Sequence, residues 1–533
     1  MASVPLLRRV LLPTACAILV VFMLLGAHQS LNPSFSKPTT HSDLGWASVW
    51  RKPSSLYGGH GVKTSRLHYL IPASHTNLQL CQNLVSSAAN GYPVPTILGW
   101  NATGDFNAAV THLAKLRAMK RYLHSLKYRE DDDLVLIVDA YDIVHQLPAE
   151  VMIERYFDVA HRADSQLAAR LNTSVAGAHK RNLRQTIFWG PDKICFPLDP
   201  RAPRCWAVPP SSMGPNAFGP HSGNGDIVFN EPRWLNSGTV LGPVGDMRRL
   251  IDITMDEIKA TYDESFELRD SDQYYISNVW ARQEYWRSKE AVHGGEVHGG
   301  PADRIIPEKR RQGEKTELHV AIEYESALFQ TKAGYEPFLT RLSFDQSNLT
   351  ATVKTDVLEA GDKFEPYSIE MPSNVQAALT RLYDAIPDAH RGTAASDWIR
   401  TVSLGVNLVT KHIYALWHCT GPKDGFDAEY RVYWWYPFAE SLLKAAVKSS
   451  QARHLISPRL IDGRRWAAKT VYPSSKKLAG SMYGGAWSDA HGGGFIPWAE
   501  LCGPHEESLF QGERNNAAPP APLNRRLKTR HQW

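Results

Sequence analysis

Two aspartates, Asp139 and Asp142, directly follow a run of five apolar residues at positions 134–138. Carboxylate oxygens are the ligands that Mg²⁺ and Mn²⁺ prefer, and these ions are often shared with a substrate phosphate. A metal held by the two acids would neutralise the negative charge that develops on a departing diphosphate. Tyr141 lies between the acids and could stack on a nucleobase. The alternative is that the acids only cap the turn after the apolar run.

A parallel sheet would place these acids at a binding edge. The chain from residue 67 onward alternates between strand-like and helix-like apolar patterns. We expect strands at 67–71, 94–99 and 134–138, separated by helices at 77–90 and 108–126. This β-α-β-α-β order predicts an α/β fold with a mostly parallel sheet flanked by helices. In such sheets the binding crevice lies beyond the carboxyl ends of the strands, where Asp139 and Asp142 stand.

The pattern after residue 230 predicts further elements. A strand-like stretch at 233–242 is expected to contain a tight turn, and a helix at 373–386 is expected to begin with Ser373 as its N-cap. The other expected elements are helices at 247–262 and 270–282, a surface loop that is Gly-rich at 293–300 and charged at 307–315, and strand character at 318–330.

Bulk composition narrows the class of protein. The chain has 533 residues, of which 43% are hydrophobic and 21% charged, as in ordinary globular proteins. Arg8, Arg9 and the basic residues of the segment 511–533 account for the whole net charge of +5, so the rest of the chain is close to neutral. A near-neutral body argues against a nucleic-acid groove, and we expect no nucleic-acid partner.

The N-terminus predicts a membrane anchor. Residues 10–27 form an uncharged apolar run, close to the length of about 20 residues that crosses a bilayer as a helix. Arg8 and Arg9 precede it, so we expect residues 1–9 in the cytosol and a single-pass type II protein. A cleaved signal peptide is the alternative. Residues 28–60 are rich in Ser, Pro, Thr and Gly and read as a stem.

Sequons and cysteines agree with a secretory lumen, either Golgi or ER. The sequons begin at Asn101, Asn172 and Asn348. In an oxidising lumen the best disulfide pair is Cys195 with Cys205, across a short Pro-rich loop. A second pair is predicted between Cys419 and Cys502, which leaves Cys81 as a buried thiol.

Seven short motifs follow one another along the chain. They are Lys115-Leu-Arg-Ala-Met-Lys120, Val138-Asp-Ala-Tyr-Asp142, Cys195-Phe-Pro197, Leu235-Asn-Ser-Gly238, Asp272-Gln-Tyr-Tyr275, Phe329-Gln330 and His418-Cys-Thr-Gly-Pro-Lys423. In this order they resemble the glycosyltransferase domain of the procollagen lysyl hydroxylases and related collagen glycosyltransferases. The resemblance spans about residues 67–436 and implies a GT-A, Rossmann-like fold that uses a nucleotide sugar, such as a UDP-sugar.

The resemblance also implies a metal and donor site. His418 would join Asp139 and Asp142 as the third ligand, and an imidazole suits Mn²⁺ better than Mg²⁺. On the donor side, Gly421 would let the backbone approach the diphosphate, and Lys423 would place a point charge on it. The other residues expected to bind the donor are Ser74, Lys115 and Tyr141.

The sugar side of the implied site holds two more acids. Asp270 and Asp272 would either deprotonate the acceptor hydroxyl or stabilise positive charge at the sugar carbon. An alternative for Asp270 is that it only caps the helix after it. Asn236 and Ser237 would hydrogen-bond a sugar hydroxyl, or they form no more than a tight turn.

The chain also departs from the family at several positions. Phe196 stands where the family has Trp on the sugar side, and Ser271 interrupts the family's acidic run. Residues 343–410 are an insertion, and nothing resembling a hydroxylase domain follows. The family's donor sugar and its collagen acceptor therefore do not carry over to this chain.

The expected protein is a luminal, metal-dependent glycosyltransferase that acts on a protein or glycan acceptor. Its catalytic domain is expected at 61–450, with an extension packed on it at 451–510 and a disordered basic tail at 511–533. Two other classes stay open at this point. One is an inactive sugar-binding scaffold of the same fold, and the other is a metal-dependent phosphoester hydrolase.

Overall fold

The computed structural model describes residues 62–515, except 109, 311, 391, 475–481 and 491–492. The expected cytosolic tail, membrane anchor and stem lie outside this range, as do residues 516–533. Within the described ranges, no helix has the length and apolar character required to span a bilayer.

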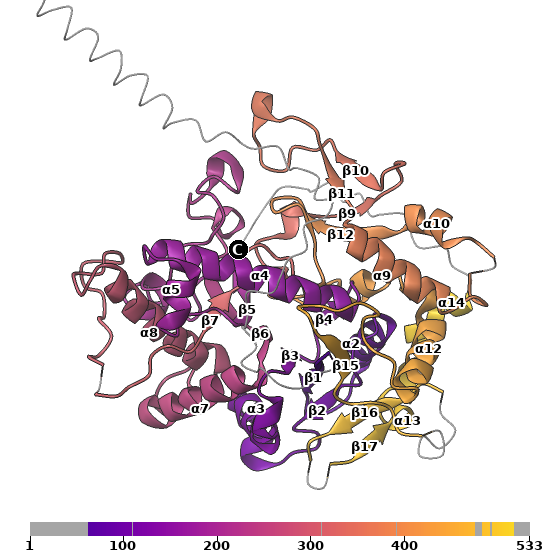
Figure 1. The fold of residues 1–533 in the computed structure, drawn as a ribbon, viewed down its shortest axis with the longest axis horizontal. Coiled ribbons are helices and arrows are strands. Elements are labelled where there is room, and N and C mark those ends of the chain that lie inside the picture. The colour runs from indigo at the N-terminus through magenta and orange to yellow at the C-terminus, as the bar shows by residue number, and fades with distance from the viewer. Residues whose placement is uncertain are drawn as a thin grey trace, which may run out of the picture. The chain divides into compact units, whose positions relative to one another are not determined.

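A nine-stranded sheet forms the centre of the fold, in the order β17-β16-β2-β1-β3-β6-β5-β7, with β15 also paired to β1 (Figure 1). Most neighbouring strands are parallel, whereas β6 is antiparallel to β3 and β5, and β17 is antiparallel to β16. The bounds are β1 Thr64–Pro72, β2 Thr96–Leu98, β3 Leu134–Val138, β5 Ile187–Asp192, β6 Trp234–Pro243, β7 Val320–Ile322, β15 Arg465–Ala468, β16 Gly485–Ser488 and β17 Phe495–Pro497. The prediction of a mostly parallel α/β sheet flanked by helices is confirmed.

Helices cover both faces of the sheet because its central strands are apolar on both sides. In β3, Leu134, Leu136 and Val138 face one hydrophobic cluster, while Val135 and Ile137 face the other. Helices α2 (Leu78–Ala89) and α4 (Ala149–Arg170) contribute to the first cluster. Helices α3 (Leu113–Ser125), α7 (Val244–Thr261) and α8 (Asp272–Ala291) contribute to the second.

The predicted β-α-β-α-β start is present as β1-α2-β2-α3-β3, with parallel pairing of β1 to β2 and β3. Asn77 caps α2 by accepting a hydrogen bond from the Leu80 backbone, and Gly91 follows the helix with a φ of +68°. Helix α3 begins at Leu113, later than the predicted residue 108. The N-cap residue is His112, and the Thr111 hydroxyl before it accepts a hydrogen bond from Leu113 N at 3.2 Å.

The stretch predicted as a strand with a tight turn is one continuous strand, β6. Asn236 and Ser237 therefore do not form a tight turn. The irregularity lies in its pairing with β5, because Trp189 pairs with Val240 whereas Gly190 pairs with Asn236. The residues between Asn236 and Val240 leave the β5 ladder, while Thr239 stays paired with Val138 of β3, so a β-bulge lies at the position of the predicted site.

Two predicted helix caps are wrong. Ser271, and not Asp270, caps α8, because the Ser271 hydroxyl accepts a hydrogen bond from Tyr274 N. The Asp270 carboxylate instead accepts one from the Thr111 hydroxyl at 2.9 Å. Helix α9 (Ser373–Asp384) starts after Pro372, and Ser373 lies inside its first turn.

The apolar stretch at 318–330 forms two strands in different sheets. β7 belongs to the central sheet, and β8 (Phe329–Thr331) pairs with β14 (Leu416–His418). The buried Glu323 carboxylate accepts hydrogen bonds from the backbone N–H groups of Glu325 and Leu328, which turns the chain between the two strands. β14 also pairs with β4 (Ile143–His145), so three short strands form a second sheet beside the first.

The predicted insertion at 343–410 forms a subdomain of short elements together with the residues that flank it, and its helix α9 contacts α4 (Figure 1). Strands β9 (Leu339–Ser343), β12 (Ser403–Asn407) and β13 (His412–Ile413) form one small sheet. A second pair of strands and two helices complete it, namely β10 (Thr350–Val353), β11 (Tyr367–Glu370), α9 and α10 (Ala395–Trp398).

The C-terminal segment is built into the central sheet rather than only packed on it. β15 pairs with β1, and β16 pairs with β2. The helices of this segment are α12 (Ala439–Gln451), α13 (Trp498–Leu501) and α14 (Glu506–Arg514). The tail predicted to be disordered from residue 511 is still helical as far as Arg514, because Arg514 bonds the Glu440 carboxylate and Glu513 accepts from the first turn of α12.

One of the two predicted disulfides is present. Cys195 is bonded to Cys205, as expected. The second bond joins Cys81 in α2 to Cys502, 421 positions later in the sequence, so the predicted Cys419–Cys502 pair is wrong. Cys419 is a buried free thiol. The Cα atoms of Cys81 and Cys502 lie 5.6 Å apart because α13 ends against α2, a contact that spacing along the chain does not reveal.

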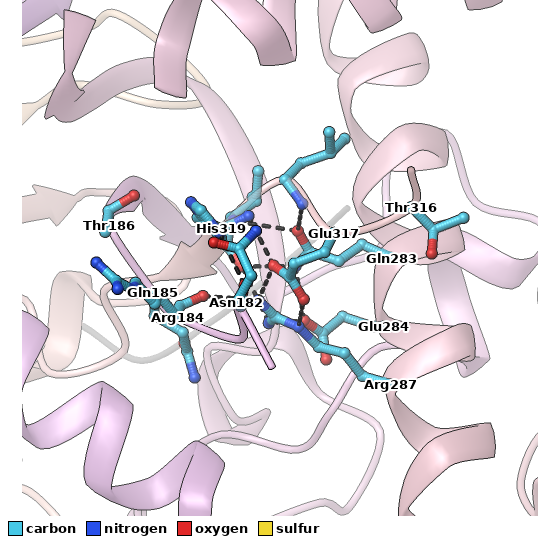
Figure 2. Close-up of polar contacts among 12 residues, drawn as sticks. Asn182, Arg184, Gln185, Thr186, Gln283, Glu284, Arg287, Thr316, Glu317 and His319 are labelled. Atoms are coloured by element: carbon cyan, nitrogen blue, oxygen red, sulfur yellow. Dashed lines mark hydrogen bonds and ion pairs between the residues drawn. The ribbon is translucent and has the colours of Figure 1, made fainter. Parts of the chain in front are cut away.

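A buried ionic network anchors the middle of α8, whose first turn carries two of the predicted site residues. Figure 2 shows the Arg287 guanidinium between the carboxylates of Glu284 and Glu317. Gln283 Nε2 donates to the Val320 carbonyl of β7. The network fixes α8 along the sheet, and so fixes the position of Asp272 and Gln273 at its start.

Candidate functional site

The three predicted metal ligands come together. Asp139 follows β3, Asp142 precedes β4, and His418 ends β14, and one ligand atom of each lies within 4.8 Å of the others. His418 Nε2 is 3.1 Å from Asp142 Oδ2. The approach results from the pairing of β14 with β4, in which His418 stands opposite Ile143 and Cys419 N donates to the Asp142 carbonyl at 2.8 Å.

Helix α2 holds the turn that carries the two aspartates. The Asn83 side chain donates hydrogen bonds to the carbonyls of Asp139 and Ala140. On the other side, Asp139 N donates to the Gly238 carbonyl of β6 at 2.8 Å. The turn is therefore fixed from both faces before any ion binds.

Gly238 is required by the packing of these ligands. A Cβ atom on Gly238 would lie 2.2 Å from His418 Cε1 and 2.8 Å from Asp139 Oδ2. Any larger residue would push the imidazole and the carboxylate apart. Sequence reasoning quoted Gly238 within the Leu-Asn-Ser-Gly motif but gave it no role, because only the fold brings His418 against it.

Two lysines neutralise part of the acidic charge. Lys423 Nζ lies 2.5 Å from Asp142 Oδ2, and Lys115 Nζ lies 2.7 Å from Asp139 Oδ1 and 3.1 Å from Asp272 Oδ2. Burial alone would lower the pKa of Lys115, but the two neighbouring aspartates outweigh it and raise that pKa above its usual value. Burial likewise tends to raise the pKa of Asp142, but His418 and Lys423 hold it well below its usual range.

The donor set fits a divalent cation such as Mn²⁺ or Mg²⁺. Asp139, Asp142 and Asp272 bring three negative charges, and Lys115 and Lys423 bring two positive ones, so one negative charge remains when His418 is neutral. Asp142 Oδ1 is buried without a hydrogen-bond partner. An unpaired buried carboxylate oxygen is costly, and a metal ion would satisfy it.

The other predicted sugar-side residues differ in whether they contact the cluster of ligands. Asp272 joins the cluster through Lys115. Asp270 is 39% exposed and bonds Thr111, and no contact to the three ligands is seen for it in the described part of the chain. Phe196 is 43% exposed in the loop closed by Cys195–Cys205. The structure therefore separates Asp272 from Asp270 and Phe196.

Three polar side chains position the backbone of β6 at the site. Asn236 Oδ1 accepts from Gly238 N at 3.0 Å, and Gln273 Oε1 accepts from Ser237 N at 3.1 Å. Asn236 Nδ2 donates to Asp192 Oδ2 at 3.4 Å. Sequence reasoning missed Asp192 and the role of Gln273. Asp192 ends a buried strand just as Asp139 follows one, and this was the signal that could have found it.

Burial raises the pKa of Asp192 to about 6, against the lowering effect of its hydrogen bonds from Asn236 and the Lys193 backbone. Its carboxyl group is therefore partly protonated near neutral pH and can donate or accept a proton. A group of this kind beside a cluster of ionised carboxylates is typical of functional sites.

A cavity of about 350 Å³ opens beside the ligands. Tyr141 and Phe426 supply its aromatic surface, and Lys423 supplies a positive charge. The other lining residues are Gln79, Gly425 and Asp427. The cavity therefore combines aromatic and cationic lining, as sites for small molecules with a ring and a charged group often do.

Of the remaining predicted donor-side residues, Tyr141 lines this cavity, and the lining residues do not include Ser74 or Gly421. The Tyr141 ring stacks on His75 with centroids 5.3 Å apart, and its hydroxyl donates to the His75 carbonyl. Ser74 hydrogen-bonds the His75 ring and accepts from Asn101 N, so it supports the tyrosine from behind. Gly421 has a φ of +71°, which explains the glycine, and it leads the chain from His418 to Lys423.

No protein-family model matches this chain, and a search of curated proteins finds no relative.

Proposed function

We propose that this protein is a metal-dependent glycosyltransferase of the GT-A fold, which transfers a sugar from a nucleotide sugar, such as a UDP-sugar, to a protein or glycan acceptor. The observation that carries the proposal is the convergence of Asp139, Asp142 and His418 beside a cavity with an aromatic wall and a lysine. A metal and a nucleotide would then share one site.

Asp139, Asp142 and His418 would hold Mn²⁺, which when bound acts as a Lewis acid towards a diphosphate. Tyr141 orients the base by stacking, and the turn at Gly421 brings backbone close to the diphosphate. Lys423 has a side chain that is 55% exposed, so it can leave Asp142 and bind a phosphate oxygen. Its charge then moves to where negative charge develops.

Asp272 lies where the sugar would project, on the far side of Lys115 from Asp139. Because it is paired with an ammonium group, it suits electrostatic stabilisation of a positive sugar carbon better than proton abstraction. Asp192 is not paired with a cation and has a pKa of about 6, which makes it the better proton acceptor of the two.

We also propose that the catalytic body lies in the lumen of the Golgi or the ER, behind the membrane anchor expected at residues 10–27. Two disulfides in the described chain suit an oxidising compartment. Asn101, Asn172 and Asn348 are all exposed, as glycosylation would require.

The test is a screen of the purified luminal chain against a panel of nucleotide sugars with Mn²⁺, in which release of nucleoside diphosphate is measured. We expect turnover with one donor class and loss of turnover in Asp142→Asn, whose fold is retained because Asn has nearly the same shape and keeps the backbone hydrogen bond from Cys419 N. Asp388→Asn, an exposed aspartate in the insertion, is the matched control and should keep full activity. Turnover by Asp142→Asn at the wild-type rate would contradict the proposal.

A further inference from the structure

A second group of potential metal ligands lies at the other end of β3. His68 on β1, Asp133 just before β3, and Glu130 in the preceding turn each bring a ligand atom within 4.8 Å of the others. All three residues are buried. Asp133 and Asp139 flank the five residues of β3, a separation of about 20 Å along a strand. The second group is therefore distinct from the candidate active site.

Two atoms in this group face each other without a hydrogen bond. His68 is fully buried, and its Nδ1 lies 3.0 Å from the Tyr122 hydroxyl. Among the described residues, its Nε2 has no hydrogen-bond partner and stands 3.6 Å from Asp133 Oδ2, which has none either. Asp133 Oδ1 is already used, since it accepts from Arg66 N at 2.8 Å.

This arrangement has the features of a metal site whose ligands are oriented in advance. When His68 Nδ1–H donates to Tyr122, the lone pair of Nε2 points at the lone pairs of Asp133, and a cation between them removes the repulsion. With bonds of about 2.0–2.1 Å and a tetrahedral angle, two zinc ligands lie about 3.4 Å apart. The observed 3.6 Å is close to this value.

We propose that His68, Asp133 and Glu130 form a buried Zn²⁺ site. One imidazole nitrogen and two carboxylate oxygens suit zinc, and a fourth position is left for water. A cavity of about 330 Å³ gives access, because Tyr122 and Lys469 line both the cavity and the cluster. The site would join β1 and the start of β3, and it is independent of the proposed transfer reaction.

Lys469 is the competitor for the ion. Its ammonium group bonds Glu130 Oε1 in the metal-free chain. The same relation holds at the candidate active site, where Lys423 bonds Asp142. The Lys469 side chain is 24% exposed and lines the cavity, so it can turn towards solvent when an ion binds to Glu130.

A hydrogen bond from His68 Nε2–H to Asp133 is the alternative to a metal, because Nδ1 could accept from the Tyr122 hydroxyl in the other tautomer. The separation of 3.6 Å between Nε2 and Asp133 Oδ2 is longer than such a hydrogen bond.

The test uses the full chain carrying Asp142→Asn, which weakens the first site. The protein is stripped with a chelator and loaded with Zn²⁺, free metal is removed, and bound zinc is counted by mass spectrometry. We expect one Zn²⁺ per chain. Adding Asp133→Asn should lower the zinc affinity by at least about tenfold, since even the loss of residues that merely orient metal ligands costs about 10–100-fold. Loading with Co²⁺ should give the strong visible absorption of a tetrahedral site.

Lys469→Met distinguishes a metal site from a plain ion pair. Removal of the competing ammonium group should increase the zinc affinity in the Asp142→Asn background. If Asp133→Asn fails to fold, Glu130→Gln takes its place, with a weaker affinity expected. Two results would overturn the proposal: no zinc bound by Asp142→Asn, or the same zinc content and cobalt spectrum with and without Asp133→Asn.

Discussion

At the scale of single residues, the packing of the candidate site depends on the absence of a side chain at Gly238. Gly238 lies against His418 and Asp139, and a methyl group there would overlap both. The chain thus combines two acids, a histidine and a glycine from three separate segments. None of these residues alone indicates a metal site, whereas together they form a cluster that could hold a divalent cation.

We predict that Gly238→Ala lowers the affinity for Mn²⁺ by at least tenfold, about 1.4 kcal/mol, because it displaces two of the three ligands. The measurement is a Mn²⁺ titration followed by nucleotide binding. Gly214→Ala is the matched control, since a Cβ at that position meets nothing within 4 Å. An unchanged Mn²⁺ affinity in Gly238→Ala would show that the ion binds elsewhere.

We predict that the free energy of unfolding depends on pH because of Asp192. Burial raises its folded pKa to about 6 from a usual value of 3.8, so folding favours the protonated form. Its contribution to stability is complete below pH 3.8 and is lost as the pH rises through 6, a change on the order of 3 kcal/mol.

The check is urea unfolding of the metal-free protein between pH 4 and 7. Relative to Asp192→Asn, the wild type should lose free energy of unfolding across this interval, because the Asn side chain does not titrate. Asp388→Asn, which is exposed, should follow the wild type. Parallel curves for the wild type and Asp192→Asn would contradict the buried environment assigned to this carboxyl group.

At the scale of elements, helix α8 positions the residues that are predicted to lie beside the sugar. Its first turn carries Asp272 and Gln273, and its middle is fixed to the sheet by Arg287 (Figure 2). Arg287 is 3% exposed and bonds Glu284, which is 2% exposed. The position of the first turn therefore depends on an ionic network far from the reacting groups.

We predict that Arg287→Met destabilises the protein by about 3–5 kcal/mol, because it removes one of the two cations that pair with the buried Glu284 and the cation that pairs with the partly buried Glu317. Arg181→Met is the matched control. Its partner Glu290 also lies on α8, but both side chains are more than 40% exposed, so its loss should cost less than about 1 kcal/mol. Denaturant unfolding measures both variants, and equal losses would argue against a buried network.

The elements near the start of the chain were predictable from sequence because their signals are local. An apolar run of five residues, a helix capped by Asn77 and a glycine at its end need no tertiary information. The same logic located Asp139 and Asp142 at a strand end. The alternative that Asp270 caps the following helix is wrong, because the Ser271 hydroxyl accepts the capping hydrogen bond from Tyr274 N.

What the sequence could not supply are contacts between distant segments. Gly238 and Gln273 acquire roles only when β14 and α8 are in place. The Cys81–Cys502 bond joins residues that no spacing rule links, which is why Cys419 was wrongly paired. His418 was found from a motif, and its distance from Asp142 follows from strand pairing that a single sequence does not show.

At the scale of the whole molecule, the two ends of the described chain share one sheet. β15 and β16 pair with β1 and β2, and Cys502 is bonded to Cys81 (Figure 1). The boundary expected at residue 450 is therefore not a boundary of the fold. The folded body includes its C-terminal segment.

We predict that a chain ending at Gln451 does not fold, because it loses β15, β16, β17 and one disulfide. Secretion yield and limited proteolysis are the measurements, with the full chain as reference. A soluble, protease-resistant product that unfolds cooperatively would show that the C-terminal strands are dispensable.

The central claim is that nucleotide and metal meet at Asp139, Asp142 and His418. The most direct measurement is UDP binding by calorimetry with and without Mn²⁺, in the wild type, Asp142→Asn and Asp388→Asn. The account predicts that Mn²⁺ tightens UDP binding by at least about tenfold in the wild type and in Asp388→Asn, and by nothing measurable in Asp142→Asn. Equal enhancement by Mn²⁺ in all three proteins, or none in the wild type, would contradict it.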